Sequence, residues 1–477
     1  MHPSLHPEPA EPPMMHADKV APSSGPGRIL LGVFETLDRA GIPYCVLHGY
    51  ENYPQRIKSD VDAVIGRAVS PGHLLAVLHQ DRERIGAEVV RCRGYYIVLA
   101  GKDADGSLCF LELDLSVDCT LDDVRYYDGP EVLASRRRHR QFWIPAANVE
   151  FGCYLARTIA KGTLDDRRTQ RLTILYKEDP ERCAQEVSRF WGVGSADVVC
   201  SAAQSGDWQP VRRHLAELRA ELRTRAILRH PERLVASKLR RAVDRLSRIW
   251  RPDGIAVVVL GPDGAGKSSV IEALEVTLTS AFARCTCWGF APSIRQLLGR
   301  PSGSTNQPHA LPARSFLISL VRASYWLAYY TFGHVRLRLA LVRSTLVLYD
   351  RHFVDILVDS KRYRYGGPSW LLPFIWRLIP KPDLIVLLNA PPQVLQARKQ
   401  EVPLEETARQ LKAYLSLVRS MKNAHIVNAA QPLEDVAADV TDIILRHLTT
   451  RIGNRVGLVQ MISAPDGRMN LNQSPAR

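Results

Sequence analysis

The sequence contains no paired Cys-x-x-Cys knuckle, and its cysteines are few and scattered. Nine cysteines, an odd number, are spread through 477 residues, so they indicate neither a disulfide framework nor a zinc site. We therefore expect reduced thiols in a cytoplasmic protein. Cys285 and Cys287 stand two apart, and a strand with both side chains on one face accounts for this spacing better than a metal site does.

Neither the N-terminal residues nor the most apolar stretch has the pattern of a membrane segment. Residues 1–28 are rich in Pro and His and lack the apolar stretch of a signal peptide, which predicts a disordered leader. The stretch Phe316–Val342 is interrupted by one histidine and three arginines, so it falls short of about 18 uncharged apolar residues. We expect a core-facing helix there, with membrane contact as the alternative.

Acidic residues are too few to balance the basic ones. Lys and Arg number 63 against 49 for Asp and Glu, and the resulting net charge of +14 indicates anionic partners such as nucleotides, sugar phosphates, nucleic acid or an acidic membrane. Between Val211 and Arg251 there are 13 basic and 4 acidic residues, so this segment carries +9 of the +14. Its apolar spacing predicts two amphipathic helices divided at Pro231.

We interpret residues 205–253 as a basic helical linker. A solvated helix face explains its charge, and binding to nucleic acid or to an anionic membrane surface stays open. Few aromatic residues lie among the basic ones, which disfavours a stacking platform for single-stranded nucleic acid.

Apolar patterns predict an α/β domain on each side of this linker. Residues 29–204 show mixed helix and strand patterns, and residues 254–449 alternate continuous apolar strands with helices, as in a doubly wound parallel sheet. Residues 450–477 are aperiodic and predict a disordered tail. The expected elements are a helix over Ile29–Ala40, strands at Tyr44–His48, Val61–Ile65, Tyr95–Ala100, Leu108–Asp118, Ile255–Leu260, Thr345–Tyr349 and Leu384–Leu388, and helices over Val149–Gln204.

The strand Ile255–Leu260 leads into a sequence that matches GxxxxGK[ST] at every fixed position. Glycines let the backbone curl until amide groups converge on phosphate oxygens at a helix N-terminus. In such a loop Lys267 spans the β and γ phosphates, and the Ser268 hydroxyl ligates Mg²⁺. The predicted nucleotide-binding residues are Gly261, Asp263, Gly264, Ala265, Gly266, Lys267, Ser268 and Ser269.

Three further segments follow the loop in order: LVLYDRH at 346–352, PDLIVLLNAPP at 382–392, and IVNA at 426–429. With GPDGAGKSS they resemble a thymidylate kinase-type nucleoside monophosphate kinase over residues 254–449. The resemblance implies ATP as donor, Asp350 beside Mg²⁺, and Arg351 on the acceptor phosphate. It also implies Asp263 near the acceptor's sugar and Arg398 as a lid arginine, for which a solvated helix face is the alternative.

Two segments differ from those kinases and leave the acceptor open. The loop Cys287–Pro292 reads CWGFAP where thymidylate kinases carry Arg-Glu-Pro-Gly-Gly, and Asp355, Asp359 and Arg362 stand where a tyrosine and glutamine pattern is expected. Trp288 and Phe290 in that loop are expected in the core, with stacking on a sugar or base as the alternative.

In the first domain, Gly49 follows a strand, and the sequence Asp60-Val61-Asp62 comes soon after. Acids two apart on a strand share a face and can hold one divalent ion, and Glu112 and Asp114 alternate with leucines in the same way. The pattern resembles the nucleotidyltransferase fold, which implies Mg²⁺ held by Asp60, Asp62 and Asp114. An exposed acidic strand is the alternative.

The expected fold class is α/β: a C-terminal P-loop NTPase with a parallel sheet and helices on both faces, plus a smaller N-terminal mixed α/β nucleotidyltransferase-like domain. The expected function is Mg-ATP-dependent transfer of phosphate to dTMP, another nucleoside monophosphate or a related small acceptor. Similar composite proteins are associated with bacterial surface polysaccharide synthesis. An ATP-binding switch, or a nucleotidyltransferase acting on nucleic acid or sugar phosphate, stays open, as does a homodimer.

Overall fold

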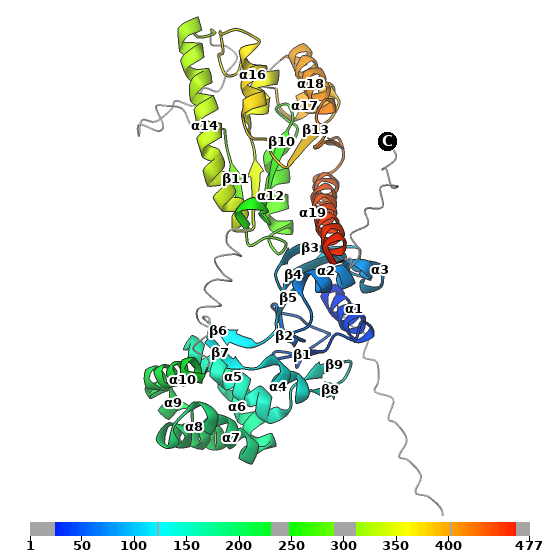
Figure 1. Ribbon diagram of the computed structural model, residues 1–477. Coiled ribbons are helices and arrows are strands. Elements are labelled where there is room, and N and C mark those ends of the chain that lie inside the picture. The colour runs from blue at the N-terminus through cyan, green and yellow to red at the C-terminus, as the bar shows by residue number, and fades with distance from the viewer. Residues whose placement is uncertain (1–23, 122–123, 230–247, 291–311, 401–402, 464–477) are drawn as a thin grey trace, which may run out of the picture.

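A computed structural model describes residues 24–121, 124–229, 248–290, 312–400 and 403–463. They form two domains stacked end to end, each built on its own five-stranded sheet (Figure 1). We call residues up to 229 the first domain and residues from 248 onward the second domain.

The sheet of the first domain is mixed. Its strand order is β1-β2-β5-β4-β3, with β2 and β5 parallel and all other neighbours antiparallel. The strands predicted at 95–100 and 108–118 are confirmed as β4 and β5, which pair antiparallel. Alternate residues of β5, such as Leu111 and Leu113, are buried under α1 and α2, so Glu112 and Asp114 face the other side. The strands are β1 (Tyr44–Val46), β2 (Val61–Ile65), β3 (Ala87–Arg93), β4 (Tyr96–Lys102) and β5 (Leu108–Ser116).

Two short ribbons and a helical layer complete the first domain. The helices from α5 onward confirm the helical pattern expected from Val149, and they bury a second apolar core against β1 and β2. The remaining elements are α1 (Gly25–Arg39), α2 (Pro71–Gln80), α3 (Arg82–Ile85), β6 (Cys119–Leu121), β7 (Val124–Tyr127), α4 (Gly129–Ala134), β8 (Arg137–His139), β9 (Phe142–Ile144), α5 (Ala147–Lys161), α6 (Asp166–Glu178), α7 (Pro180–Phe190), α8 (Val193–Ser205), α9 (Gln209–Arg213) and α10 (Leu215–Arg229).

The sheet of the second domain is entirely parallel, with order β11-β12-β10-β13-β14. The strands predicted at 255–260, 345–349 and 384–388 are confirmed because their continuous apolar runs are buried on both faces. The strands are β10 (Ile255–Leu260), β11 (Arg284–Trp288), β12 (Thr345–Tyr349), β13 (Leu384–Asn389) and β14 (Ala424–Asn428).

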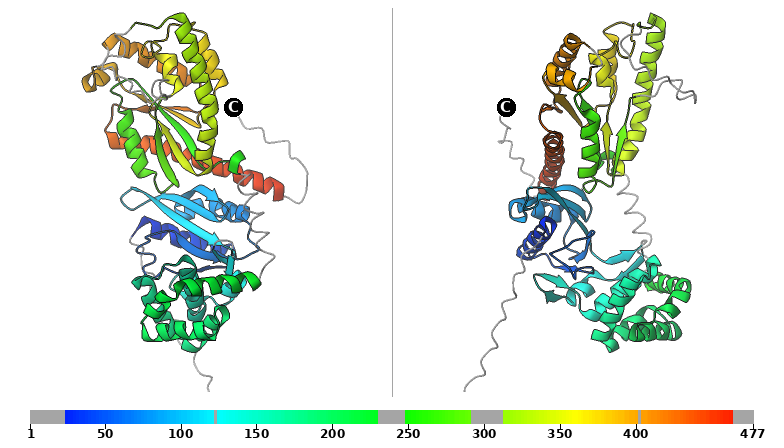
Figure 2. Two further views of the ribbon diagram at one scale, coloured as in Figure 1. Left: turned by 90° about the vertical axis from the view of Figure 1, so that its left-hand side faces the viewer. Right: turned by 180° about the vertical axis from the view of Figure 1, so that it is seen from behind.

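Helices cover both faces of this sheet (Figure 2). Helix α14 has the bounds predicted from the sequence, and none of the described helices is long and apolar enough to cross a membrane. The helices are α12 (Lys267–Thr277), α14 (Phe316–Val342), α15 (Phe353–Val358), α16 (Leu371–Leu378), α17 (Pro392–Arg398), α18 (Leu404–Arg419) and α19 (Leu433–Ser463).

The two domains share a continuous apolar core. Val90 and Val98 of the first domain pack with Leu274 and Leu278 at the C-terminal end of α12. Helix α19 crosses from the second domain to the first and lies along β3 and α2 (Figure 1). The first domain therefore attaches to the amino-terminal edge of the parallel sheet.

Three predicted boundaries were wrong. The leader was expected to reach residue 28, but α1 begins at Gly25, where small residues allow close packing: a Cβ on Gly27 would lie 2.0 Å from the Pro54 carbonyl oxygen. The linker was expected from 205, but Leu218 and Leu222 of α10 are buried in the first domain. The predicted split at Pro231 lies outside the described residues.

The tail was expected from residue 450, but α19 continues to Ser463. Its last turns are stabilised by contacts with the first domain that sequence periodicity alone does not show. Ile452 and Val456 join the core of the first domain, and the Arg455 guanidinium donates to the Cys92 carbonyl oxygen. The nine cysteines are all free, as expected.

We predict that Ile452→Asp uncouples the two domains. Ile452 is 1% exposed, and a carboxylate buried there without a partner should lower the free energy of unfolding by about 3 kcal/mol or more. Denaturant unfolding should then show two transitions. Asn454→Asp places the same residue type on the exposed side of the same turn and should leave unfolding unchanged. Equal effects of the two substitutions would contradict this interface.

Candidate functional site

The glycine-rich loop, residues 261–266, joins β10 to α12 at the carboxyl edge of the parallel sheet. Gly261, Gly264 and Gly266 have φ values of 153°, 84° and 84°, which residues other than glycine rarely adopt. A Cβ on Gly264 would lie 2.6 Å from the Leu395 carbonyl oxygen, so the loop also packs closely against α17. The first amides of α12 lack helical partners and can bind an anion.

Lys267 is the first residue of α12 and is held over the loop. Its ammonium donates to the carbonyl oxygens of Gly261 at 2.8 Å and Pro262 at 3.1 Å. Burial lowers the pKa of Lys267, so an anion beside it would be favourable. Ser268 and Ser269 are exposed next to it. This cradle fits a nucleotide phosphate, and the Ser268 hydroxyl with the Asp350 carboxylate are oxygen donors of the kind Mg²⁺ takes.

Asp263 connects the loop to the segment after β12. Its carboxylate forms an ion pair with Arg362, and its Oδ1 lies 3.5 Å from Arg351 Nη2. Asp350 is half-buried at the end of β12, where its backbone N–H donates to the Trp288 carbonyl oxygen at 3.1 Å and joins the ends of β12 and β11. The structure therefore brings the predicted residues Asp263, Asp350 and Arg351 together.

Two buried carboxylates lie beside these arginines. Asp355 accepts hydrogen bonds from the His352 backbone N–H at 2.8 Å and the Tyr414 hydroxyl at 2.7 Å, while burial raises the pKa of Asp355. Asp359 accepts from the Arg362 backbone N–H and from Gln410 Nε2, both at 3.1 Å. With the loop they line a small polar cavity. Sequence reasoning missed Tyr414 and Gln410, because they lie on α18, more than fifty residues further along the chain.

Arg398 was predicted as a lid arginine. In the structure its Nη1 donates to the Ala429 carbonyl oxygen at 2.8 Å and so connects the end of α17 to the turn after β14. In the strand order, β10 with its loop lies between β12, which Arg351 follows, and β13, which precedes Arg398. Arg398 and Arg351 therefore lie on opposite sides of the loop. Its side chain is exposed, as that of a solvated helix-face residue is.

The aromatic residues after β11 belong to a packed cluster. The ring of Phe290 lies 4.7 Å from that of Tyr363 and 6.0 Å from that of Trp326, measured between centroids. Trp288 packs edge-on against Tyr349 at 5.7 Å. Trp288 and Phe290 are half-buried, since they pack against the apolar cores and also line a cavity of about 630 Å³. Tyr363 connects this cluster to the small polar cavity beside the loop.

The acids predicted in the first domain lie at the centre of its sheet. Asp62 on β2 stands directly opposite Asp114 on the parallel strand β5, and Asp60 immediately precedes β2. Burial, followed by the charges of Asp62 and Asp60, raises the pKa of Asp114 to about 6. Burial and Asp62 also raise the pKa of Asp60. The three carboxylates therefore repel one another in a partly dry site.

Arg157, which sequence reasoning missed, partners these acids. Its Nη1 donates to Asp62 Oδ1 at 2.8 Å, and His48 Nε2 lies 3.5 Å from Asp62 Oδ2. Burial lowers the pKa of His48 to about 4, so this imidazole is neutral. Within the ranges that the structure describes, no group of three or more His, Cys, Asp and Glu side chains is arranged to hold a metal ion. The arrangement does not fit the Mg²⁺ site implied by the resemblance, because a guanidinium binds Asp62.

A cavity of about 510 Å³ opens beside the two partners of Asp62, His48 and Arg157. Basic side chains from α5 and α6 dominate its walls: Arg157, Lys161, Arg167, Arg168 and Arg171. Burial and the charge of Arg157 lower the pKa of Lys161. Arg157, Arg168 and Arg171 form ion pairs with Asp62, Asp165 and Glu150, so the basic residues of the walls outnumber their acidic partners. The cavity is suited to a ligand that carries several negative charges.

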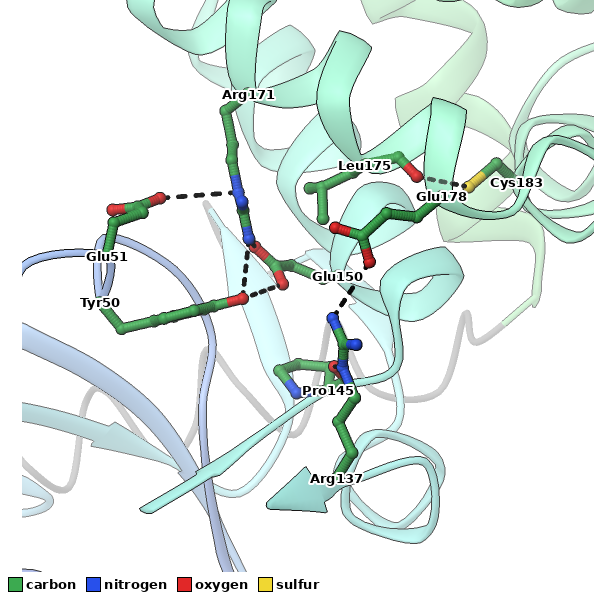
Figure 3. A network of polar contacts seen from close by, with 9 residues as sticks. All are labelled: Tyr50, Glu51, Arg137, Pro145, Glu150, Arg171, Leu175, Glu178 and Cys183. Carbon is green, nitrogen blue, oxygen red and sulfur yellow. Dashed lines mark hydrogen bonds and ion pairs between the residues drawn. The ribbon is translucent and has the colours of Figure 1, made fainter. Parts of the chain in front are cut away.

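A polar network fixes the loop that borders this cavity (Figure 3). The Tyr50 hydroxyl donates to the buried carboxylate of Glu150, and Arg171 Nη2 donates to both, at 2.7 Å to Tyr50 Oη and 2.5 Å to Glu150 Oε1. Arg171 Nε also lies 3.5 Å from Glu51 Oε1. The residues after Gly49 are thus held against α5 and α6.

We predict that Asp114→Asn stabilises the protein at neutral pH. Because the pKa of Asp114 is raised in the folded state, folding favours its protonated form, and the free energy of unfolding falls as pH rises from about 4 to 6. At pH 8 the asparagine variant should be more stable by about 1–2 kcal/mol, less than the full shift implies because the side chain is only partly buried. The gain should vanish near pH 4.

Thermal unfolding at both pH values measures this difference. The exposed Asp197→Asn serves as the control and should change stability at neither pH. A gain for Asp114→Asn that is equal at both pH values would contradict the raised pKa.

Comparison with known proteins points to one kind of enzyme. No protein-family model matches the chain. A probable thymidylate kinase of Thermococcus gammatolerans is 28% identical over 224 residues, which is 42% of this chain and 100% of that relative. A probable thymidylate kinase of Pyrobaculum aerophilum is 26% identical over 40% of this chain and 96% of the relative. The thymidylate kinase of Xanthomonas oryzae pv. oryzae is 25% identical over 42% of this chain and 88% of that relative.

These relatives are matched over nearly their whole length but cover less than half of this chain. The share is comparable to the size of the second domain, whose parallel α/β sheet carries the glycine-rich loop. The similarity therefore supports a nucleotide kinase-like region within a longer chain.

Proposed function

We propose that the second domain is a Mg-ATP-dependent phosphotransferase that acts on a nucleoside monophosphate or a related small phosphorylated acceptor. The observation that carries the proposal is the placement of Lys267 and Arg351 close to Asp263, at the carboxyl edge of a parallel sheet. Ligands bind at this edge in open α/β folds. The similarity to thymidylate kinases supports the same class of reaction.

The donor nucleotide would bind the loop and the start of α12. Its phosphates would accept hydrogen bonds from the loop amides, and the Lys267 ammonium would exchange the carbonyl oxygens of Gly261 and Pro262 for phosphate oxygens. Ser268 and Asp350 would hold Mg²⁺, which neutralises phosphate charge when bound. Arg398, fixed between α17 and Ala429, would border the donor on the other side.

The acceptor phosphate would bind Arg351 and Arg362. Both guanidinium groups form ion pairs with Asp263, so two arginines are gathered where the acceptor phosphate would bind. Asp359 positions Arg362 because it accepts a hydrogen bond from the Arg362 backbone N–H. Asp355 stabilises the turn after Arg351 because it accepts a hydrogen bond from the His352 backbone N–H. Catalysis in this arrangement consists of holding two phosphates in line and stabilising the charge that moves between them.

We predict that Lys267→Ala lowers acceptor-dependent ADP formation by about 100-fold or more, because one fixed cation at the transferred phosphoryl is lost. The assay compares dTMP, other nucleoside monophosphates, sugar phosphates and a blank without acceptor. Lys412→Ala, an exposed lysine on α18, should retain full activity. If dTMP stimulates ADP formation, the second domain acts as a thymidylate kinase. If another compound stimulates it, the same fold uses a different acceptor. ATP binding with no stimulation by any acceptor would contradict phosphotransfer and favour an ATP-binding switch.

The first domain supports a second proposal: it binds a nucleotide or another polyphosphate in the cavity lined by α5 and α6. The carrying observation is the cluster of Arg157 and Lys161 next to Asp62 and Asp114, on a sheet in which those two acids are in register. The nucleotidyltransferase-like pattern of the sequence gives the same ligand class. Asp62 and Asp114 do not have the arrangement of a metal site among the described residues. We therefore propose that the first domain binds the ligand, and we derive no transfer reaction for it.

We predict two classes of ATP-binding site in titration calorimetry of the full chain. Arg157→Ala should weaken one class by about 10-fold or more, because a charge-assisted hydrogen bond contributes about 1.5–3 kcal/mol, and Lys267→Ala should weaken the other. Arg182→Ala, a surface arginine on α7 whose side chain is 70% exposed, serves as the control. A single class of site that only Lys267→Ala weakens would contradict nucleotide binding by the first domain.

A further inference from the structure

A second, smaller cavity adjoins the basic cavity of the first domain. Its volume is about 260 Å³, and Glu51 and Arg171 line both cavities. In its walls Glu178 forms an ion pair with Arg137, next to the network of Tyr50 (Figure 3). Glu51 is paired with Arg171 in the same way. We call the two adjoining cavities together the track.

The β8–β9 hairpin supplies the cations of the smaller cavity. Its sequence over residues 136–140 is RRRHR, four arginines and a histidine without an acid. Arg137, Arg138 and Arg140 line the cavity, together with Arg171 of α6. Burial, followed by the charges of Arg140, Arg137 and Arg171, lowers the pKa of His139 in the same wall. Guanidinium groups from two elements therefore converge on this cavity.

Arg140 has an unusual backbone conformation for an arginine. It lies in the two-residue turn between β8 and β9 with a φ of 53°, where glycine or asparagine is the usual residue. Its Nη1 donates to the Tyr53 carbonyl oxygen at 3.0 Å, and it forms no ion pair with any residue that the structure describes. Strained positions of this kind are concentrated at functional sites. The conformation therefore indicates that a positive charge is required at this turn.

Cations without an acidic partner lie in both cavities. Within the described part of the chain, Lys161 and Arg167 of the larger cavity form no ion pair, and neither does Arg140 of the smaller one. Helix α6 borders the track from Arg167 to Glu178, about 16 Å from about 11 residues at 1.5 Å per residue. A nucleoside triphosphate carries its negative charge at one end only. A ligand that matches these cations needs negative charge along its whole length.

We propose that the track binds a single-stranded nucleic acid. The phosphates of one segment would lie against the cations of α5 and α6, and those of the following nucleotides would pass Arg171 and reach the β8–β9 hairpin. At about 3.4 Å of axis per phosphate in a stacked strand, the track spans about five nucleotides. The proposal rests on the nucleotide binding proposed for the first domain and extends it from a single nucleotide to a strand.

An aromatic face supports a nucleic acid over an inorganic polyphosphate. Tyr154 of α5 lines the larger cavity and is half-buried, and its ring lies 5.4 Å from that of His48, measured between centroids. Stacking of a base on such a ring holds a strand without reading its sequence. A chain of phosphates alone would gain nothing from this ring.

The test measures binding of a fluorescein-labelled oligothymidylate of about twelve nucleotides by fluorescence anisotropy. All measurements use the full chain with Lys267→Ala, so that the glycine-rich loop does not contribute. The oligothymidylate should bind at least about 10-fold more tightly than dTTP, which carries the same base, because its phosphates reach both cavities, and its affinity should fall steeply with salt.

Arg140→Gly tests the smaller cavity. It should weaken oligothymidylate binding by about 10-fold and leave dTTP binding unchanged, because the phosphates of dTTP would occupy the larger cavity alone. Glycine adopts a φ of 53° without strain, so the variant should keep its fold and thermal stability. Arg182→Ala, the surface arginine on α7, is the control and should change the binding of neither ligand.

Two further variants test the larger cavity. Arg167→Ala should weaken both ligands by about 10-fold, because this cavity would take phosphates of either one. Tyr154→Leu should weaken oligothymidylate binding by about 5-fold or more, because a stacked base is lost, and should leave the binding of inorganic polyphosphate unchanged.

The outcomes separate this proposal from the one on which it rests. Oligothymidylate that binds no more tightly than dTTP, or that Arg140→Gly does not weaken, would overturn the strand and leave the nucleotide site standing. Arg167→Ala without effect on either ligand would contradict the nucleotide site itself. Inorganic polyphosphate that binds as tightly as oligothymidylate, with no effect of Tyr154→Leu on either, would overturn nucleic acid and assign the track to a phosphate chain.

Discussion

The parallel alignment of five strands is the constraint on which the second domain depends. Parallel strands end at one edge, so the loop after β10, the Asp350-Arg351 pair after β12 and the turn after β14 meet although they are far apart in the chain. Buried apolar runs on β10, β12 and β13 hold that edge in place from both faces. The edge can then hold a buried ammonium group, that of Lys267, and a loop whose glycines adopt positive φ.

The opposite edge of the same sheet holds the first domain. Asp253 and Gly254, just before β10, accept hydrogen bonds from Arg451 and Arg455 of α19, while the end of α12 packs against β3 and β4. Helix α12 thus begins at the glycine-rich loop and ends in the domain interface. The basic cavity of the first domain is built from α5 and α6, beside the acids of its own sheet. Each candidate site is therefore built from the residues of one domain, and neither site includes residues of the interface between the domains.

Much of this could be predicted because it depends on local sequence. Three of the five strands of the second domain were predicted almost to the residue, since long runs of Val, Ile and Leu are typical of buried parallel strands. The loop was found because its glycines and lysine are close together in the chain. The acids of the first domain were found as an alternating pattern, which fixes the face that they share on each strand. The parallel pairing of β2 and β5 then places Asp62 opposite Asp114.

What could not be predicted depends on contacts between distant segments. Arg157 binds Asp62 from a helix 95 residues away, and nothing in its own neighbourhood sets it apart from other arginines. The end of α19 is helical because Ile452 and Val456 are buried by the first domain, which periodicity within the segment does not reveal. Tyr414 and Gln410 contact Asp355 and Asp359 only because α18 folds back over β13.

Binding of a nucleotide at the carboxyl edge of the second domain, through the loop at Lys267, is tested most directly by amide hydrogen exchange. The full chain is compared with and without a non-hydrolysable ATP analogue and Mg²⁺. We predict slower exchange in residues 261–269 and at the start of α12, and loss of that protection in Lys267→Ala. Unchanged exchange in residues 261–269, under conditions where calorimetry shows the analogue to be bound, would contradict nucleotide binding by this loop.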